Sequence, residues 1–289
     1  MRILVTGANG ILGRALRERL AGGNTLFLWG REEADVTDEV QVRHAARGLD
    51  FDAVIHGAAY TNVDGAESDP DLAMAVNRDG TRHVAAIARE RGASLVYVSS
   101  DYVFDGTKGA PYVEEDPPHP LSVYGASKLA GEEAALRSGA PCLVVRTSWL
   151  FGSGGKNFVD TIAAKALRGE PLEVVDDQRG SPTYARDLAH GIELLLRRGA
   201  LGIVHVTNAG ETTWHGLAVE IARTLSVPTP ILPTTTAKMN RPAPRPAYSA
   251  LSGERYRALA GAPLPPWQDA VHRHLAERSG GSGRQGEAA

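Results

Sequence analysis

Short, continuous apolar runs alternate with amphipathic segments along the first half of the chain. ILVT at 3–6 and TLFLW at 25–29 are the first two such runs, and each is followed by a turn. Continuous apolar runs are typical of strands that are buried on both faces. The segments between them space their apolar residues three and four positions apart, as helices with one buried face do. This pattern predicts a parallel sheet that helices cover on both sides, with right-handed crossovers.

The predicted elements of this part define the fold class. Strands and helices alternate in a regular order, which predicts an α/β fold with a doubly wound parallel sheet of the Rossmann type. The strands are expected at 3–6, 25–29, 53–56, 94–99 and 141–147, and the helices at 11–21, 39–47, 69–91 and 122–137.

The pattern changes after Trp149, where helices dominate and strands are few. Too few strands follow for a second large sheet, so these segments predict a smaller α/β substrate-binding lobe interleaved with the first domain. Helices are expected at 157–169, at 212–225 with Thr212 or Thr213 as the N-cap, and at 265–279; a strand is expected at 203–208 and a long proline-rich loop at 226–250.

Two structural units are therefore expected. Residues 1–149, together with about 180–206, form the predicted Rossmann domain. The predicted substrate-binding lobe takes about 150–179 and 207–277. The glycine-rich stretch at 279–289 is predicted to be a disordered tail.

Composition narrows the class of protein. With 289 residues, 43% hydrophobic and 22% charged, the chain has the composition of an ordinary soluble globular protein. The net charge of −3, without a basic stripe, argues against nucleic acid or an anionic membrane as a partner. The single cysteine, Cys142, lies in the apolar run CLVVR and indicates a reducing compartment. Since no apolar stretch is long enough for a membrane span or a signal peptide, a cytoplasmic protein is expected.

A glycine-rich turn joins the first predicted strand to the first predicted helix. Gly7, Gly10 and Gly13 occur there in the order strand, turn, helix. Such glycines let the backbone approach a pyrophosphate closely, and the N-terminus of a helix favours its negative charge. The turn therefore predicts binding of a dinucleotide coenzyme.

The end of the second predicted strand bears on the choice of coenzyme. A carboxylate there would bind the 2′-hydroxyl of NADH and repel the 2′-phosphate of NADPH, but Trp29 is followed by Gly30 and Arg31. Because a guanidinium pairs well with phosphate, NADPH is expected, with NADH as the alternative. A solvated surface arginine remains an open interpretation of Arg31. Asp35 is a candidate for the adenine amino group or for the cap of the next helix.

Two further stretches follow strands whose ends face the ligand crevice of such a sheet. Small residues at Ala58 and Ala59 would let the coenzyme lie close to the chain. Asn77 has a poor helix propensity, and would bond to backbone below the site or be simply solvated. Ser100 would donate to a substrate carbonyl and Asp101 would accept from a sugar hydroxyl, although alone they would indicate only a turn.

Tyr124 and Lys128 lie four residues apart in SVYGASKLAGEE, so they share one face of the predicted helix. A cation favours the phenolate, which would lower the pKa of Tyr124 and make it a usable proton donor nearer neutral pH. Together with the glycine-rich turn, this pair predicts hydride transfer between a nicotinamide coenzyme and a carbonyl group.

The motifs GANGILG, SSDYVFDG and YGASKLAGE together resemble the extended short-chain dehydrogenase/reductase superfamily. Within it, the chain is similar to the dTDP-4-dehydrorhamnose reductase family from residue 1 to about 277. This resemblance implies an oxidoreductase that uses NADPH to reduce the 4-keto group of dTDP-4-dehydro-L-rhamnose, giving dTDP-L-rhamnose in nucleotide-sugar biosynthesis. The motifs that carry the narrower resemblance are RTSWLFG at 146–152, DQRGSPTYARDLA at 177–189, ETTWHGLA at 211–218, RPAPRPAYSAL at 241–251 and LPPWQDAV at 264–271.

The resemblance also implies roles for individual residues. Tyr124 would donate the proton, and Lys128 would bind the nicotinamide ribose and lower the pKa of the tyrosine. Ser100 stands where the family usually has threonine, and both hydroxyls serve the same purpose. Asp101 and Trp149 would contact the sugar nucleotide. With the residues already named, the expected coenzyme contacts are Gly7, Gly10, Ile11, Leu12, Gly13, Arg31, Asp35, Val36, Ala58, Ala59, Tyr60, Asn77, Tyr102, Tyr124 and Lys128.

Two further features concern charged residues. Arg245, in the proline-rich loop, is a candidate cation for the substrate diphosphate. Some members of the family dimerise through Mg²⁺ held by glutamates, but the matching positions here are Ala15 and Arg186, and only Glu277 remains. Since a cation repels Mg²⁺, no metal is expected, and the protein is expected to be a monomer or a weak homodimer.

Two alternatives remain open. A 4-ketoreductase for another dTDP-deoxysugar would share every catalytic residue named above. A non-catalytic regulatory subunit of the methionine adenosyltransferase type would share the fold and much of the patterning. The intact set of Ser100, Tyr124 and Lys128 argues against the second alternative.

Overall fold

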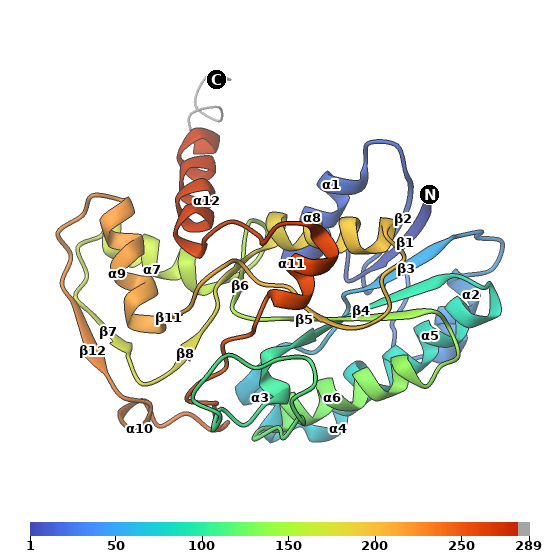
Figure 1. The fold of residues 1–289 in the computed structure, drawn as a ribbon, viewed down its shortest axis with the longest axis horizontal. Coiled ribbons are helices and arrows are strands. Elements are labelled where there is room, and N and C mark those ends of the chain that lie inside the picture. The colour runs from blue at the N-terminus through green and yellow to red at the C-terminus, as the bar shows by residue number, and fades with distance from the viewer. Residues whose placement is uncertain (283–289) are drawn as a thin grey trace.

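A six-stranded parallel sheet forms the centre of the first domain (Figure 1). In the computed structural model, which describes residues 1–282, the strand order is β10-β5-β4-β3-β1-β2. The order changes direction between β1 and β3, which is where folds of this kind bind their ligands. The strands are β1 (Arg2–Thr6), β2 (Thr25–Trp29), β3 (Ala53–His56), β4 (Ser94–Ser100), β5 (Cys142–Thr147) and β10 (Gly202–His205).

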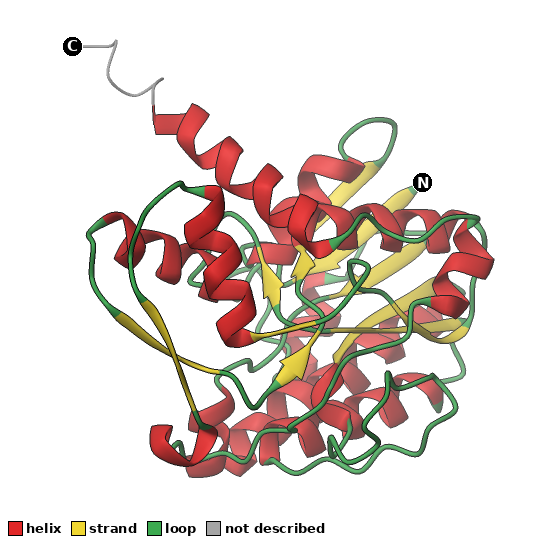
Figure 2. Cartoon of the chain, turned by 60° about the vertical axis from the view of Figure 1, so that its left-hand side comes forward, coloured by secondary structure: helices red, strands yellow, loops and turns green. Residues whose placement is uncertain are grey.

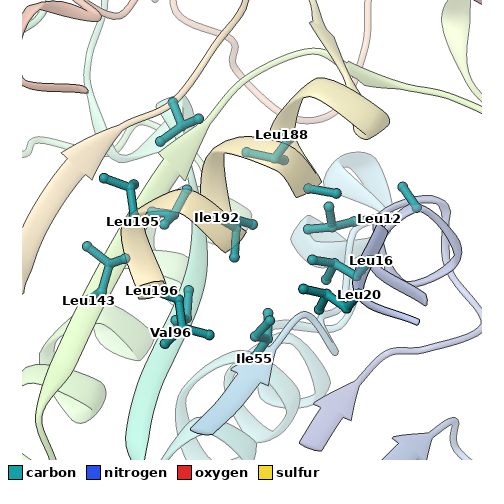
Figure 3. Packing of buried hydrophobic residues seen from close by; sticks show 14 of the residues in the cluster. Leu12, Leu16, Leu20, Ile55, Val96, Leu143, Leu188, Ile192, Leu195 and Leu196 are labelled. Carbon is teal, nitrogen blue, oxygen red and sulfur yellow. The ribbon is translucent and has the colours of Figure 1, made fainter. Parts of the chain in front are cut away.

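Helices cover both faces of this sheet and confirm the predicted doubly wound α/β fold. On one face, leucines of α1 and α8 pack against Ile55, Val96 and Leu143 of the strands (Figure 3). On the other face, α2, α5 and α6 bury a second apolar cluster against the same strands. The bounds are α1 (Ile11–Leu20), α8 (Ala185–Arg197), α2 (Glu39–Ala45), α5 (Gly80–Glu90) and α6 (Val123–Leu136).

A smaller lobe lies beside the sheet and has its own core, as Figures 1 and 2 show. Its centre is the parallel pair β7 (Leu172–Val175) and β12 (Ile231–Thr234), covered by three helices. Two short pairs join the lobe to the sheet. The remaining elements are α7 (Phe158–Leu167), α9 (Trp214–Thr224), α12 (Trp267–Ser282), β6 (Leu150–Phe151) with β9 (Thr183–Tyr184), and β8 (Arg179–Gly180) with β11 (Thr212–Thr213).

Several segments after residue 200 differ from expectation. The predicted loop at 226–250 contains β12 and the short helix α10 (Thr236–Met239). Of the two N-caps expected for α9, Thr213 is the one that the structure has. Helix α11 (Glu254–Ala260) was not predicted, and its Tyr256 packs into the core beside α8 rather than in the small lobe.

The C-terminal helix also runs further than predicted. Residues 279–282 are helical, so this part of the expected disordered tail is wrong, while 283–289 lie outside the described residues. Within residues 1–282, no helix combines the length and the apolar character that a membrane crossing needs.

The helix predicted at 69–91 is broken into three parts. α4 (Pro70–Met74) leads into a π-helical turn, η1 (Ala75–Asp79), and this continues as α5. The π turn holds Asn77, which is 1% exposed and points into the protein. Irregular turns of this kind often mark functional positions, because they redirect a side chain without ending the helix.

Candidate active site

The carboxyl ends of the parallel strands bring the predicted site residues to one edge of the sheet. The glycine-rich turn follows β1, Ala58 follows β3, and Ser100 ends β4. Trp149 comes two residues after β5, while Tyr124 and Lys128 reach the same edge from α6. Parallel pairing of these strands places the ends side by side. Residues that are far apart in sequence therefore gather at one edge of the sheet, where folds of this kind have their ligand crevice.

The glycine-rich turn is pressed against the end of β3. Gly7 has a φ of +69°, and a Cβ on it would lie 2.7 Å from the backbone of Gly57 and Ala58. A Cβ on Gly13 would lie 2.3 Å from the carbonyl oxygen of Gly7. The N-cap of α1 is Gly10, which has no side chain to cap the first amides of the helix. This cradle suits a pyrophosphate held close to the backbone.

The end of β2 carries a carboxylate that the sequence pattern did not reveal. Glu33 turns back, and its Oε2 accepts a hydrogen bond of 2.6 Å from the backbone N–H of Gly30. The statement that no carboxylate stands at this strand end is therefore wrong. Arg31 is 86% exposed and pairs with Asp35 at 3.2 Å.

Asp35 does not cap the next helix. It accepts hydrogen bonds from the backbone and the hydroxyl of Thr37, which lower the pKa of its carboxyl group. Asp38 is the N-cap of α2 and accepts from Val40 and Gln41. The capping interpretation of Asp35 is thus wrong, and its adenine contact stays a prediction.

Asn77 fixes the segment that follows β3. Its Oδ1 accepts from the backbone N–H of Tyr60 at 2.9 Å, and its Nδ2 donates to the Tyr60 carbonyl and, at 2.8 Å, to Ser127 on α6. Because the side chain is buried and fully bonded, the interpretation as a solvated asparagine is wrong. Asn77 sets the distance between the Ala58–Tyr60 segment and the helix that carries Tyr124.

A pair of hydrogen bonds holds the carboxylate next to Tyr124. The hydroxyl of Ser100, which acts on the pKa of Tyr124, donates to Asp101 Oδ1 at 3.0 Å. The other oxygen, Oδ2, accepts a hydrogen bond of 2.6 Å from Ser249. Burial raises the pKa of Asp101 to about 6, and its hydrogen bonds oppose this shift. The ring of Tyr102 meets the Tyr124 ring edge-on, with centres 5.5 Å apart.

Tyr124 and Lys128 share a helix face, but they do not interact as predicted. Lys128 Nζ donates to the carbonyl of Val98 at 2.7 Å and lies 4.3 Å from the centre of the Tyr97 ring. Burial raises the pKa of Tyr124 to about 12, with the Ser100 bond opposing it. The prediction that Lys128 lowers the pKa of Tyr124 is therefore wrong for the protein without its coenzyme. A high pKa keeps Tyr124 protonated, which is the form that a proton donor needs.

Trp149 packs against the small lobe at this edge of the sheet. Its φ of +46° is rare for a bulky residue. The indole stacks on Trp214 of α9 at 3.6 Å between ring centres, and a Cβ on Gly180 would lie 2.5 Å from it. Gly180 therefore has to be glycine for this packing. The stack joins the small lobe to the end of β5.

Arg245 lies close to the crevice, but its charge already has a partner. Nη2 pairs with Asp64 at 2.9 Å and Nη1 donates to the Ala243 carbonyl at 2.7 Å. Arg241 reaches the same Asp64 oxygen at 3.3 Å. Two guanidinium groups thus converge on one carboxylate of α3 (Val63–Ser68).

The positions discussed for a metal lie away from this crevice. Ala15 is buried in α1, and the Arg186 guanidinium bonds to Glu277 at 2.8 Å and to Glu18 at 3.0 Å. Glu277 also accepts from the hydroxyl of Tyr184. Its carboxylate is therefore engaged by the protein's own donors. The expectation that no metal binds here stays a prediction.

The fold and the site define an oxidoreductase of the extended short-chain dehydrogenase/reductase class, with a glycine-rich turn and a helix carrying Tyr124 and Lys128 on one sheet edge. A family model described as the RmlD substrate binding domain matches residues 1–279. The chain belongs to this family.

Named relatives agree with that assignment. A dTDP-4-dehydrorhamnose reductase of Streptomyces griseus is 43% identical over 98% of this chain and 96% of its own length. A probable dTDP-4,6-dihydroxy-2-methyloxan-3-one 4-ketoreductase of Streptomyces antibioticus is 44% identical over 94% of this chain and 93% of its own length. The crystal structure of a Bacillus anthracis dTDP-4-dehydrorhamnose reductase in complex with NADP has a TM-score of 0.93 and 37% identity, covering 96% of this chain and 99% of that one.

Three residues of the site were missed by sequence reasoning. Ser249 and Asp64 come from segments with no clear periodicity, and nothing local shows that they approach Asp101 and Arg245. Glu33 lies in EEAD, where its position three residues after Gly30 was a usable signal for a turn that folds back.

Proposed function

We propose that this protein reduces the 4-keto group of dTDP-4-dehydro-L-rhamnose with NADPH, giving dTDP-L-rhamnose. The observation that carries the proposal is the grouping of Tyr124 beside the hydrogen-bonded pair Ser100–Asp101, with Lys128 one helical turn behind Tyr124. A proton donor, a polar group for a carbonyl and an acceptor for a sugar hydroxyl converge there. The membership of the chain in the reductase family supports the same reaction.

The coenzyme site fits a nicotinamide dinucleotide. The cradle at Gly7, Gly10 and Gly13 has no room for side chains, and it opens towards the N-terminal amides of α1. When bound, the coenzyme supplies the hydride that reduces the substrate carbon. Lys128 would hold the nicotinamide ribose, and Ala58 and Ala59 would line the floor. NADPH is the proposed coenzyme because a structural relative was solved with NADP, and NADH remains the alternative.

Tyr124 moves the proton in this mechanism. It donates its hydroxyl proton to the oxygen of the substrate carbonyl, while Ser100 turns its own hydroxyl from Asp101 to hold that oxygen by a hydrogen bond. The raised pKa of Tyr124 ensures that it starts in the acid form at neutral pH. A positioned general acid of this kind is worth ~10²–10⁴-fold in rate.

The substrate would lie between the sheet edge and the small lobe. Asp101 would accept from a sugar hydroxyl, and Trp149 would contact the sugar nucleotide. Arg245 would meet the diphosphate, for which its bond to Asp64 would have to be exchanged. Charge-assisted pairing of arginine with phosphate is strong enough to compete with one carboxylate.

A second candidate is a 4-ketoreductase that acts on another dTDP-deoxysugar. The 44% identity to the Streptomyces antibioticus protein favours it, because it is as high as the 43% identity to the Streptomyces griseus dehydrorhamnose reductase. The residues of the proton path would be the same in both.

We further propose a monomer or weak homodimer in the cytoplasm that binds neither nucleic acid nor membranes. The buried free thiol of Cys142 and the slightly negative charge support these assignments.

The test is an assay of the purified protein with NADPH and a panel of dTDP-4-keto sugars, following loss of nicotinamide absorbance. Fast turnover of dTDP-4-dehydro-L-rhamnose with slow turnover of the other sugars is expected. A preference for another sugar would select the second candidate, and turnover of none would contradict both.

A further inference from the structure

A third polar residue extends the catalytic face of α6 into the protein. Tyr124, Lys128 and Glu132 are each four residues apart, so they lie one above the other along one side of the helix. Glu132 is 1% exposed, which is unusual for a carboxylate. None of the steps described above uses it.

Glu132 is held by a single partner from the sheet. Arg146 of β5 donates to its two oxygens from Nε at 2.9 Å and from Nη2 at 2.7 Å, and both side chains are 2% exposed. The guanidinium also lies over the ring of Phe104, 5.0 Å from its centre. This two-pronged geometry fixes the position of the carboxylate as well as its charge.

Stability alone does not account for such a pair. Removing two charges from water costs about as much as their attraction returns, and apolar residues of similar size often serve equally well. The pair also lies next to a catalytic lysine rather than in a remote part of the core. The position of the Glu132–Arg146 pair therefore indicates that the pair acts on Lys128.

Lys128 has few other charged neighbours. His56 of β3 faces it but stays neutral, because burial and the lysine charge lower the pKa of the imidazole to about 3. Tyr97 of β4 offers its ring and is likewise neutral, since burial raises its pKa. Tyr124, one turn before Lys128 on the same helix, is also neutral, because burial raises its pKa. Burial lowers the pKa of Lys128 to about 7, and Glu132 is the group that opposes this shift.

The helix is also pressed close to the sheet at this level. A Cβ on Gly131 would lie 2.2 Å from the hydroxyl of Tyr97 and 2.4 Å from the carbonyl oxygen of Asn77. Tyr97 in turn bonds to the carbonyl of Lys128. The Glu132–Arg146 bond ties the same turn of α6 to β5, so α6 is fastened to two strands beneath Lys128.

We propose that Glu132 and Arg146 are positioning residues for Lys128, which hold its ammonium at Val98 and the Tyr97 ring and keep it charged. The carboxylate supplies the negative charge that Lys128 needs, and the guanidinium keeps that carboxylate in place. Neither residue touches the substrate. This inference rests on the proposed function, because it gives Lys128 its role at the coenzyme ribose.

The test replaces the pair by apolar residues of similar size, as Glu132→Leu with Arg146→Met. This double variant is expected to fold with a Tm close to that of the unchanged protein. The variant loses one charge of each sign, and because Glu132 is the one that raises the pKa of Lys128, the ammonium should lose its proton at lower pH. The alkaline limb of kcat/KM should move down by about one pH unit, so that activity on that limb falls roughly tenfold.

A second measurement does not depend on turnover. The chain has five lysines, so the Cε signal of Lys128 is assignable by NMR with a Lys128→Met variant. In the free protein, the midpoint of its titration should be lower in the double variant by a similar amount. An unchanged midpoint would overturn the inference. A shifted midpoint in a protein that reduces no dTDP-sugar would instead contradict only the proposed function.

Glu133 provides the matched control on the same helix. It is half exposed and pairs with Arg137 at 3.3 Å on the solvent side of α6. Glu133→Gln should leave both the titration of Lys128 and the pH profile unchanged. A shift of equal size in this control would show that any lost charge on α6 has the effect, and would also overturn the inference.

Discussion

Ser249 donates a hydrogen bond of 2.6 Å to Asp101 across 148 residues of sequence. The bond fastens the proline-rich loop to the end of β4 and buries the carboxylate, which is 1% exposed. A carboxyl group in this environment prefers its neutral form, and its pKa is about 6.

The raised pKa of Asp101 predicts how stability depends on pH. The folded protein holds this proton more tightly than the unfolded chain, so the stabilisation is present below pH 4 and is lost as pH rises through about 6. Asp101→Asn removes the effect. The difference between the free energy of unfolding of the variant and that of the unchanged protein should therefore be more favourable to the variant at pH 7 than at pH 4, by up to about 3 kcal/mol. Urea unfolding at both pH values measures this, and an equal difference at the two would contradict it.

Tyr124→Phe should lower kcat by ~10²–10⁴-fold and leave the Kd for NADPH nearly unchanged. The ring and its contact with Tyr102 remain, and only the transferable proton is lost. Steady-state kinetics and coenzyme fluorescence titration give the two numbers.

Tyr256→Phe is the control for this substitution, because Tyr256 is buried in α11 beside α8 and away from the crevice. Its kcat should match that of the unchanged protein. Equal loss of rate in both variants would remove Tyr124 from its role.

Glu33→Gln should raise the preference for NADPH over NADH. The carboxylate at the Gly30 amide occupies the strand end where a 2′-phosphate would lie, and two negative charges repel each other. Removing one charge should change the ratio of kcat/KM for the two coenzymes by about tenfold. Glu32→Gln changes the same charge one residue away, on an exposed side chain, and should alter the ratio much less. If both variants behave alike, Glu33 has no specific part in the choice.

Gly131→Ala should destabilise the protein by about 1–3 kcal/mol, since the new methyl group would overlap the Tyr97 hydroxyl and the Asn77 carbonyl. Thermal unfolding gives the change. Gly22→Ala is the matched control, because a Cβ there has nothing within 4 Å, and it should be neutral or slightly stabilising. A stable Gly131→Ala protein would show that α6 is free to shift away from the sheet.

Much of this architecture follows from local pattern. The apolar runs that end at Thr6, His56 and Thr147 are strands because their residues are buried on both faces, and an unbroken run of apolar residues records that burial. The glycine-rich turn is visible because its geometry excludes side chains. The face shared by Tyr124 and Lys128 can also be predicted from the sequence, since helix spacing alone defines it.

Other features depend on contacts between distant segments and leave no local signal. The bond of Ser249 to Asp101, the pairing of Arg245 with Asp64 and the π turn at Asn77 each need the folded chain. The expected lowering of the Tyr124 pKa was wrong for a related reason. Spacing along a helix predicts which residues are neighbours, but the ammonium of Lys128 turns inward to the Val98 carbonyl instead.

Two contacts of the proline-rich loop make the candidate site depend on both parts of the chain. Arg245 joins it to Asp64, and Ser249 joins it to Asp101, which belong to the part of the chain that precedes residue 149. A fragment made of that first part alone would keep the tyrosine and the lysine, yet its buried acid would lose a donor. A chimera that joins the first part of this chain to the small lobe of a relative would therefore keep these contacts only if the relative has matching residues in its loop.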